Sequence, residues 1–358
     1  MGKRLSPYVD DTERKLTDLG LRDSSARMLP PNSVILSSRA PIGHLVINTK
    51  PMATNQGCKG LVPRSQLQTK FLYYYLSSIV NLLNALGTGT TFKELSGGKL
   101  KEVTIPVASL SEQRRITGIL DEAFDGIATA KANAEKNLEN ARALFESYLQ
   151  TLFAPRNGEW IEKRKSLADL CELIVDCEHK TAPTQEKGTP SIRTPNIGKG
   201  KLLLDGVYRV SEETYQEWTR RAEPRAGDLI LAREAPAGNV AVIPKGLRVC
   251  LGQRTVLMRP RKDVFDSYFL AMLLLQPQLQ RKLLAHSRGA TVQHVNMKDI
   301  RALDVGAVPS LSEQHSIVSK INCVSIENEK LISLYRRKLD ALDELKKSLL
   351  HKAFTGEL

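Results

Sequence analysis

The sequence has no long apolar run and no clustered cysteines. No stretch approaches the roughly 18 apolar residues of a membrane span, and no apolar core of a signal peptide follows the first residues. The five cysteines are scattered and form no Cys-x-x-Cys pair, which argues against a zinc site and a disulfide framework. We therefore expect a cytoplasmic protein with free thiols and no membrane association.

Motifs for catalysis and cofactor binding are also missing. The run Gly198-Lys199-Gly200-Lys201 lacks the spacing of a phosphate-binding loop, and no Gly-x-Gly-x-x-Gly follows a predicted strand. Pro30-Pro31-Asn32 does not match the Asn/Asp-Pro-Pro-aromatic signature of amino-methyltransferases. Glu344-Leu345-Lys346 matches the Glu-x-Lys of nucleases, but it falls inside a predicted helix, where we expect a solvent-exposed face. We predict a non-catalytic protein with no cofactor and no bound metal.

The charge balance is strongly basic. The chain of 358 residues has 52 Lys and Arg against 39 Asp and Glu, a formal net charge of +13. Such a balance favours a polyanionic partner, with nucleic acid ahead of a membrane surface. A basic surface with no partner is the alternative.

One long amphipathic segment occurs twice in the chain. The tetrapeptide Leu110-Ser111-Glu112-Gln113 returns 201 residues later as Leu311-Ser312-Glu313-Gln314. After each copy, apolar residues recur at steps of three and four, which is the spacing of one stripe on a helix. We predict two long helices paired as an antiparallel coiled coil, and the same stripe would also serve for docking a partner. The residues assigned to helix pairing or partner docking are Ile116, Leu120, Ile127, Leu138, Leu144, Tyr148, Ile317, Ile321, Leu331, Tyr335, Leu342 and Leu349.

The repeat extends beyond these helices. Ala40-Pro41-Ile42-Gly43 aligns with Ala235-Pro236-Ala237-Gly238 at a spacing of 195, and Gly89-Thr90-Thr91 aligns with Gly289-Ala290-Thr291 at 200. Several matches in one order indicate an internal duplication. The first copy lacks about 40 residues at its start, which correspond to residues 156–195 of the second copy.

The chain therefore divides into two modules and two helices, with residues 1–109 as the first module, 110–155 as the first helix, 156–310 as the second module and 311–358 as the second helix. Both modules are predicted to mix strands and helices. The predicted strands cover 34–36, 44–47, 103–105, 170–175, 191–193, 228–231 and 239–243, and the predicted helices cover 71–86 and 268–284.

These features resemble the specificity (S) subunit of type I restriction–modification systems. The matching segments are 106–113 and 309–314, which carry the Leu-x-Glu-Gln signature, together with 227–240, 290–296 and 350–358. The resemblance implies an α+β fold with two target recognition domains separated by two long conserved helices. It also implies a non-catalytic subunit that reads a bipartite target in double-stranded DNA and docks methyltransferase (M) and restriction/translocase (R) subunits.

The short first module departs from the family pattern. We expect it to be unstable, to read its half-site weakly, or to be completed by residues upstream of Met1. Two further alternatives remain open for the whole chain. One is a scaffold that binds nucleic acid or protein without reading sequence, and the other is the specificity subunit of a modification-only or fused type II-like system.

Sequence-specific readers present Arg, Lys, Asn, Gln or Thr on loops that reach base edges, with further cations for phosphates. We predict such loops in both modules. In the second module the candidates for DNA contact are His179, Lys180, Thr181, Arg193, Lys199, Lys201, Arg233, Gln253, Arg254, Arg288, Thr291 and His294. In the first module they are Arg39, Thr88, Thr90 and Lys93.

Overall fold

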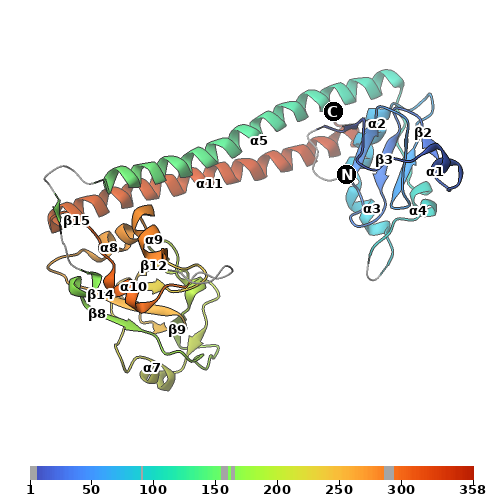
Figure 1. Cartoon of the computed structure of the whole chain (residues 1–358). Coiled ribbons are helices and arrows are strands. Elements are labelled where there is room, and N and C mark those ends of the chain that lie inside the picture. Colours follow the sequence, from blue (N-terminus) through green and yellow to red (C-terminus); the bar gives the residue numbers. More distant parts are fainter. Residues whose placement is uncertain (1–5, 90–91, 155–159, 163–165, 286–293) are drawn as a thin grey trace. The chain divides into compact units, whose positions relative to one another are not determined.

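The computed structural model describes residues 6–89, 92–154, 160–162, 166–285 and 294–358 (Figure 1). The chain forms two compact units, which we call unit 1 (residues 1–139 and 332–358) and unit 2 (residues 140–331). Each long helix contributes one part to each unit, whereas the predicted bounds treat the helices as segments separate from the two modules. No helix in the described ranges combines the length and apolar character that crossing a bilayer requires.

The two long helices are α5 (Leu110–Leu152) and α11 (Leu311–Thr355). Both begin in the same way, because the Ser109 hydroxyl accepts a hydrogen bond from the Glu112 N–H and the Ser310 hydroxyl accepts one from the Glu313 N–H, each at 3.3 Å. After α11, Gly356 adopts a left-handed backbone conformation with φ of 81°, which favours glycine at a helix end.

The helices pair in an antiparallel sense within each unit, as predicted. In unit 1, Ile116 and Leu120 near the start of α5 share a core with Leu350 and Ala353 near the end of α11. Unit 1 also contains an ion pair between the Lys131 Nζ and Asp343 Oδ1 of the two helices at 2.6 Å.

In unit 2 the opposite ends meet. Leu152 near the end of α5 shares a core with Ile317 and Ile321 near the start of α11, and Phe145 and Tyr148 pack against this core. The predicted α+β fold with an antiparallel pair of long helices is confirmed.

Ten of the twelve residues assigned to helix pairing or partner docking are buried or half-buried, and two are exposed. Five of them are buried, namely Ile116, Leu120, Ile127, Ile317 and Ile321. Five are half-buried, namely Leu138, Tyr148, Tyr335, Leu342 and Leu349. Leu144 is 73% exposed and Leu331 is 39% exposed, so neither pairs the helices. Both Leu144 and Phe145 lie one helical step from the buried Ala141, and Phe145 is the one that packs against the core.

Unit 1 contains a four-stranded sheet in the order β1 (Tyr8–Val9), β4 (Leu45–Asn48), β3 (Val34–Ser37) and β6 (Cys58–Leu61). Its further elements are α1 (Asp18–Arg22), β2 (Met28–Leu29), β5 (Met52–Ala53), α2 (Thr69–Ser78), α3 (Val80–Leu86) and α4 (Gly97–Lys101). Val34 and Leu36 on the sheet share a core with Leu72 and Leu76 of α2.

The predicted strand over 103–105 is wrong. Val103 and Ile105 pack against the core of the sheet and α2, so their alternation with Thr104 comes from packing. The Thr104 carbonyl accepts a hydrogen bond from the Tyr75 hydroxyl at 2.6 Å. An apolar alternation of three residues does not distinguish such an extended segment from a paired strand.

Unit 2 contains a four-stranded antiparallel sheet in the order β12 (Val240–Val242), β11 (Leu229–Ala232), β14 (Thr255–Pro260) and β8 (Cys171–Asp176). A three-stranded sheet has the order β10 (Arg209–Val210), β9 (Thr189–Ile192) and β13 (Cys250–Leu251), and β15 (Ala307–Val308) pairs with β7 (Ile161–Glu162). The helices of unit 2 besides α5 and α11 are α6 (Leu167–Leu170), α7 (Glu212–Trp218), α8 (Ser267–Leu274), α9 (Pro277–Leu284), α10 (Met297–Ala302) and the 3-10 helix η1 (Thr194–Asn196).

Strand β11 is buried on both faces. Leu229 and Leu231 face the core that includes α8, whereas Ile230 and Ala232 belong to a second core with Ile192 of β9. This double burial explains why the sequence of β11 is a continuous apolar run and not an alternating one.

The hairpins β3–β4 and β11–β12 are copies of each other. The Gly43 N–H donates to the Ser37 carbonyl at 3.0 Å, and the Gly238 N–H donates to the Ala232 carbonyl at 2.8 Å. Both glycines are left-handed, with φ of 105° and 86°. β6 pairs with β3 as β14 pairs with β11, so the duplication predicted from the sequence is present in the backbone.

The described part of unit 1 contains fewer elements than unit 2. β1 pairs in parallel with β4, and Gly200 bridges in parallel to Ala241 of β12, so unit 1 begins near the equivalent of Gly200. Among the described residues of unit 1, nothing corresponds to α6, β8 or β9. Because β8 covers the outer edge of β14, its loss leaves the equivalent strand β6 paired on one side only in the described structure.

The repeated glutamine ties each long helix to its unit. Gln113 is fully buried, and its side-chain amide donates to the Gln66 and Ala108 carbonyls at 2.9 and 2.8 Å while accepting from the Gln68 N–H at 2.8 Å. This pattern satisfies both donors and one acceptor of the amide.

Gln314 repeats it at the start of α11. Its amide donates to the Val264 and Pro309 carbonyls at 2.9 and 3.0 Å and accepts from the Asp266 N–H at 2.9 Å. The Leu-Ser-Glu-Gln signature therefore has a structural role, which is to fix a helix start against the loop that precedes α2 or α8.

Candidate nucleic-acid interface

Unit 2 gathers polar side chains from four separate segments around one small cavity. The cavity has a volume of about 200 Å³ and is lined by His179, Arg233, Glu234, Gln253, Arg254 and His294. Five of these six residues are predicted candidates for DNA contact, and Glu234 is the addition. They follow β8 and β11 or precede β14 and α10, so the sheet brings together loops that are far apart in the sequence.

Arg233 lies at the centre of this group and is 9% exposed. Its Nη1 donates to the Asp176 Oδ2 at 2.6 Å, and its Nε donates to the Val295 carbonyl at 3.0 Å. Its Nη2 lies 2.9 Å from the His294 Nε2. The Arg233 main chain also bonds on both sides, donating to the Arg254 carbonyl and accepting from the Val295 N–H, each at 2.9 Å.

These contacts define the tautomer of His294. A guanidinium only donates hydrogen bonds, so the His294 Nε2 must accept from Arg233 and carries no proton. The proton is therefore on Nδ1, which donates to the Glu234 Oε1 at 2.7 Å. His294 therefore links Arg233 to Glu234 through its two ring nitrogens, and it restricts where the Glu234 carboxylate can lie.

Glu234 in turn holds the exposed Arg254. The Arg254 Nη1 lies 2.8 Å from the Glu234 Oε2, and at the other end of the network the His179 Nε2 lies 3.4 Å from the Asp176 Oδ2. The two carboxylates are each 17% exposed, whereas Arg254 and His179 are 63% and 68% exposed. A buried centre with two exposed ends suits the presentation of hydrogen-bond donors to a ligand.

The main chain at Arg254 is also constrained. Arg254 adopts φ of 62°, which is uncommon for a residue other than glycine. Two residues earlier, the Gly252 N–H donates to the Ile192 carbonyl at 2.7 Å, and a Cβ on Gly252 would lie 2.7 Å from that oxygen. The turn before β14 therefore sets the direction of the Gln253 and Arg254 side chains.

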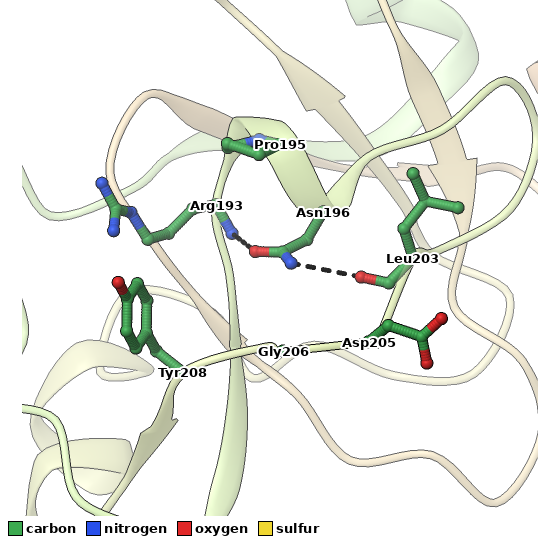
Figure 2. A pocket seen from close by; sticks show the side chains of 7 residues that line it. All are labelled: Arg193, Pro195, Asn196, Leu203, Asp205, Gly206 and Tyr208. Atoms are coloured by element: carbon green, nitrogen blue, oxygen red, sulfur yellow. Dashed lines mark hydrogen bonds between the residues drawn. The ribbon is translucent and has the colours of Figure 1, made fainter. Parts of the chain in front are cut away.

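A second, larger cavity lies beside η1. Figure 2 shows its lining by Arg193, Pro195, Asn196, Leu203, Asp205, Gly206 and Tyr208, and its volume is about 570 Å³. The Asn196 side chain accepts from the Arg193 N–H and donates to the Leu203 carbonyl, both at 3.1 Å, so it holds the two walls together.

Arg193 and Tyr208 form the exposed side of this cavity. The Arg193 guanidinium lies 5.4 Å from the centre of the Tyr208 ring, and Tyr208 is 54% exposed. A cation over an aromatic ring offers a charge for a phosphate and a flat face for a sugar or base. Sequence reasoning found Arg193 but missed Tyr208, because no motif marks an exposed tyrosine.

The remaining candidates in unit 2 are dispersed. Lys180 and Thr181 are exposed on the loop that follows His179, and Lys199 is exposed in the turn before Gly200. Lys201 forms an exposed ion pair with Glu329 of α11 at 2.9 Å. Arg288 and Thr291 lie outside the described residues.

In unit 1, Arg39, Thr88 and Lys93 are exposed and come together around Glu94. Arg39 and Thr88 both bridge to Glu94 through the main chain, and Lys93 is its neighbour in sequence. Thr90 lies outside the described residues.

The prediction of Arg233 as a DNA contact needs correction. Its side chain is buried and donates to Asp176, His294 and the Val295 carbonyl, so these donors are not available to a base edge. Its position in a turn next to a proline and a glycine made it look like a surface residue in the sequence.

The buried cysteines of unit 2 are not suited to act as nucleophiles. Burial raises the pKa of Cys171 and Cys250 to about 12 and raises the pKa of Cys177, which lies beside Asp176. These thiols stay protonated near neutral pH and are poor nucleophiles. Within the described ranges, no three His, Cys, Asp or Glu side chains come together as metal ligands.

Comparison with known proteins gives a consistent result. A family model described as "Type I restriction modification DNA specificity domain" matches residues 5–140 and 159–334. The type I restriction enzyme MjaIX specificity subunit of Methanocaldococcus jannaschii is 24% identical, over 98% of this chain and 83% of its own length. The EcoBI specificity subunit of Escherichia coli is 23% identical, over 92% of this chain and 74% of its own.

Two solved structures share the fold. The first comes from a structural study of complex assembly and conformational transition of the type I R-M system. It superposes with a TM-score of 0.76 and 20% identity, covering 95% of this chain and 86% of its own length. The HsdS subunit from Thermoanaerobacter tengcongensis gives a TM-score of 0.60 and 19% identity, with coverage of 95% and 85%.

Proposed function

This chain belongs to the family of type I restriction modification DNA specificity domains, and we propose that it reads a bipartite target in double-stranded DNA for methyltransferase and restriction subunits. The observation that carries the proposal is the cavity in unit 2, whose buried ion pairs hold exposed His179 and Arg254 beside Gln253. These are side-chain types that read base edges. The net charge of +13 supplies the attraction to the phosphate backbone.

The two halves of the target fall to the two modules of the sequence. In this proposal residues 156–310 read one half-site, and residues 1–109 contact the other through Arg39, Thr88 and Lys93. The long helices of residues 110–155 and 311–358 act as spacers that set the gap between half-sites.

Partner docking falls to the helices. Six large apolar side chains remain exposed along α5 and α11, namely Leu110, Leu144, Ile326, Leu331, Leu334 and Leu345. Large apolar side chains on a charged helix surface are typical of protein interaction sites. We assign them to the docking of methyltransferase subunits, which perform the methylation, while restriction subunits perform the cleavage.

Selection from a randomised duplex library tests the reading of DNA. The purified full chain is expected to enrich one motif, and the affinity for the enriched duplex should exceed that for a scrambled duplex by at least about 10³-fold. Both affinities should fall steeply with salt, because phosphate contacts release counterions. Equal affinity for both duplexes at every salt concentration would contradict the proposal.

The alternative of a scaffold without sequence specificity has one supporting observation, which is that the described residues of unit 1 contain no strand equivalent to β8. A scaffold of this kind predicts the same salt dependence but no enriched motif. The library selection therefore separates the two functions.

A further inference from the structure

The network in unit 2 ends in one exposed arginine whose position is set from behind. Arg254 extends from a constrained turn, and its Nη1 lies 2.8 Å from the Glu234 Oε2. In the described structure no protein group bonds the Nε and Nη2 side of this guanidinium. That side carries two parallel N–H donors, which match the O6 and N7 acceptors of guanine in the major groove.

Glu234 is itself held by the buried part of the network. Its Oε1 accepts from His294, whose other ring nitrogen accepts from Arg233, and Arg233 is anchored to Asp176 at 2.6 Å. Each of these hydrogen bonds involves a charged group or an imidazole nitrogen of fixed role. The side chains of Asp176, Arg233, Glu234 and His294 are 10% to 33% exposed. Such a chain restricts the rotamers of Glu234 and thereby those of Arg254.

Resting on the proposed function, we propose that Arg254 reads a guanine in the half-site of unit 2, and that Arg233, His294 and Glu234 are positioning residues for it. Arg233 has no direct contact with DNA in this arrangement. The position of Arg254 as reader depends on the carboxylate of Glu234, because a free arginine on a turn samples many rotamers and loses entropy on binding.

The unit 1 copy has none of this arrangement. The Ser38 N–H donates to the Gly57 carbonyl, just as the Arg233 N–H donates to the Arg254 carbonyl in unit 2. The Leu95 N–H donates to the Ser38 carbonyl, just as the Val295 N–H donates to the Arg233 carbonyl. Ser38, Gly57 and Glu94 therefore stand where unit 2 has Arg233, Arg254 and His294. Unit 1 offers an internal comparison, because its loop at Gly57 has no side chain to present.

The experiment measures base preference at each position of the enriched motif by library selection with the full chain. Arg254→Ala is expected to lower the preference for guanine at one position by about 10- to 100-fold and to leave the other positions unchanged. Glu234→Gln keeps an acceptor for His294 but removes the charge that holds Arg254, so the preference at the same position should fall by about 5-fold or more.

The double variant Glu234→Gln/Arg254→Ala should fall no further than Arg254→Ala alone, because both changes act on one contact. Arg233→Lys keeps the charge but loses the fork, and it should relax the same position. If Arg233→Lys fails to fold, Glu234→Gln still decides the matter, since it leaves the buried Arg233–Asp176 pair intact.

The matched control is Arg259→Lys. Arg259 forms a two-point ion pair with the buried Asp228 in the same unit, at 2.8 Å for each bond, away from the cavity. This control should lower the melting temperature and leave every base preference unchanged. A purely structural role for Glu234 would give the same pattern as Arg259→Lys, and that result would overturn the positioning role.

A motif that Arg254→Ala leaves unchanged would overturn the reading role while the proposed function stands. If the wild-type chain enriches no motif, the proposed function itself fails. The two failures are therefore distinguishable in one experiment.

Discussion

The two units place different residues at the same point of a duplicated sheet. In unit 2 the residue after β11 is Arg233, buried and paired with Asp176 of β8 at 2.6 Å. In unit 1 the residue after β3 is Ser38, which is fully buried and whose hydroxyl has no hydrogen-bond partner in the described structure. Unit 1 has no described counterpart of β8, so the described residues of unit 1 contain no counterpart of Asp176.

This difference indicates that the buried Arg233 and strand β8, which carries its partner Asp176, occur together. A buried guanidinium is stable only with a partner, because the loss of hydration of an unpaired charge costs several kcal/mol. The described residues of unit 1 contain no counterpart of β8, yet they share the hairpin and the buried-glutamine contacts with unit 2. They contain no counterpart of the polar network.

The largest expected effect comes from moving the arginine into the unit that lacks its partner. Ser38→Arg should destabilise unit 1 by about 3–5 kcal/mol, because the new charge would be buried without a counterpart of Asp176. Hydrogen exchange of the β3 amides in the full chain measures this effect, and the β11 amides of unit 2 serve as the internal reference.

The control for this substitution is Ser38→Ala. Removing an unpartnered buried hydroxyl should leave stability unchanged or raise it by up to about 1 kcal/mol. A Ser38→Arg variant as stable as the wild type would mean that unit 1 supplies a partner, and the contrast with unit 2 would be lost.

The second prediction concerns what the two units share. Gln113→Ala and Gln314→Ala should each destabilise its own unit by about 2–4 kcal/mol, because each removes a buried amide and leaves two carbonyls and one N–H, most of them partly buried, without partners. Denaturant-dependent hydrogen exchange, read separately for α2 and α8, checks the two effects. Glu112→Gln, next to Gln113 but exposed in part, should change stability by less than about 0.5 kcal/mol. Unequal losses at the two glutamines would weaken the view that the copies share one architecture.

The smallest expected effect concerns the ion pairs of the long helices. The hydrogen bond from Lys131 lowers the pKa of Asp343 below its ordinary value. A carboxyl with a lowered folded-state pKa stabilises the fold above its unfolded pKa, and this contribution is lost as pH falls through the folded value. Asp343→Asn should therefore lower the stability of unit 1 by about 0.5 kcal/mol or less at pH 7, and this effect should shrink as the pH falls below the ordinary carboxyl pKa of about 3.9.

The matched variant for that prediction is Glu329→Gln, which removes the ion pair with Lys201 in unit 2. Its effect should be smaller, because these two side chains are 69% and 62% exposed, against 31% and 54% for Lys131 and Asp343. Urea unfolding midpoints at pH 7 and pH 3 provide the measurement. An Asp343→Asn effect of equal size at both pH values would contradict the assignment to this ion pair.

The sequence was sufficient to predict the long helices, the duplication and most strands, because these features follow from periodicity and repeated motifs. It predicted a strand at 103–105 in error and placed Leu144 in the helix stripe, since an apolar residue at the right step does not reveal which neighbour packs better. Local pattern carries no information on the tertiary partner that decides such cases.

For the site, the sequence identified five residues of the small cavity but not their roles. His179, Gln253, Arg254 and His294 were predicted as contacts from loop position and side-chain chemistry. The central position of Arg233 depends on Asp176, which is 57 residues away in sequence. Glu234 was missed because a carboxylate is an unfavourable neighbour for DNA, and only the structure reveals that it bonds His294 and Arg254.

The most direct test of the account is the methylation motif in a cell that expresses this chain together with the methyltransferase subunit proposed as its partner. The account predicts one bipartite motif genome-wide, in which Arg254→Ala makes one position of one half degenerate and Arg39→Ala leaves that half unchanged. Methylation without any sequence preference, or a motif that depends on Arg39 in the half altered by Arg254→Ala, would contradict it.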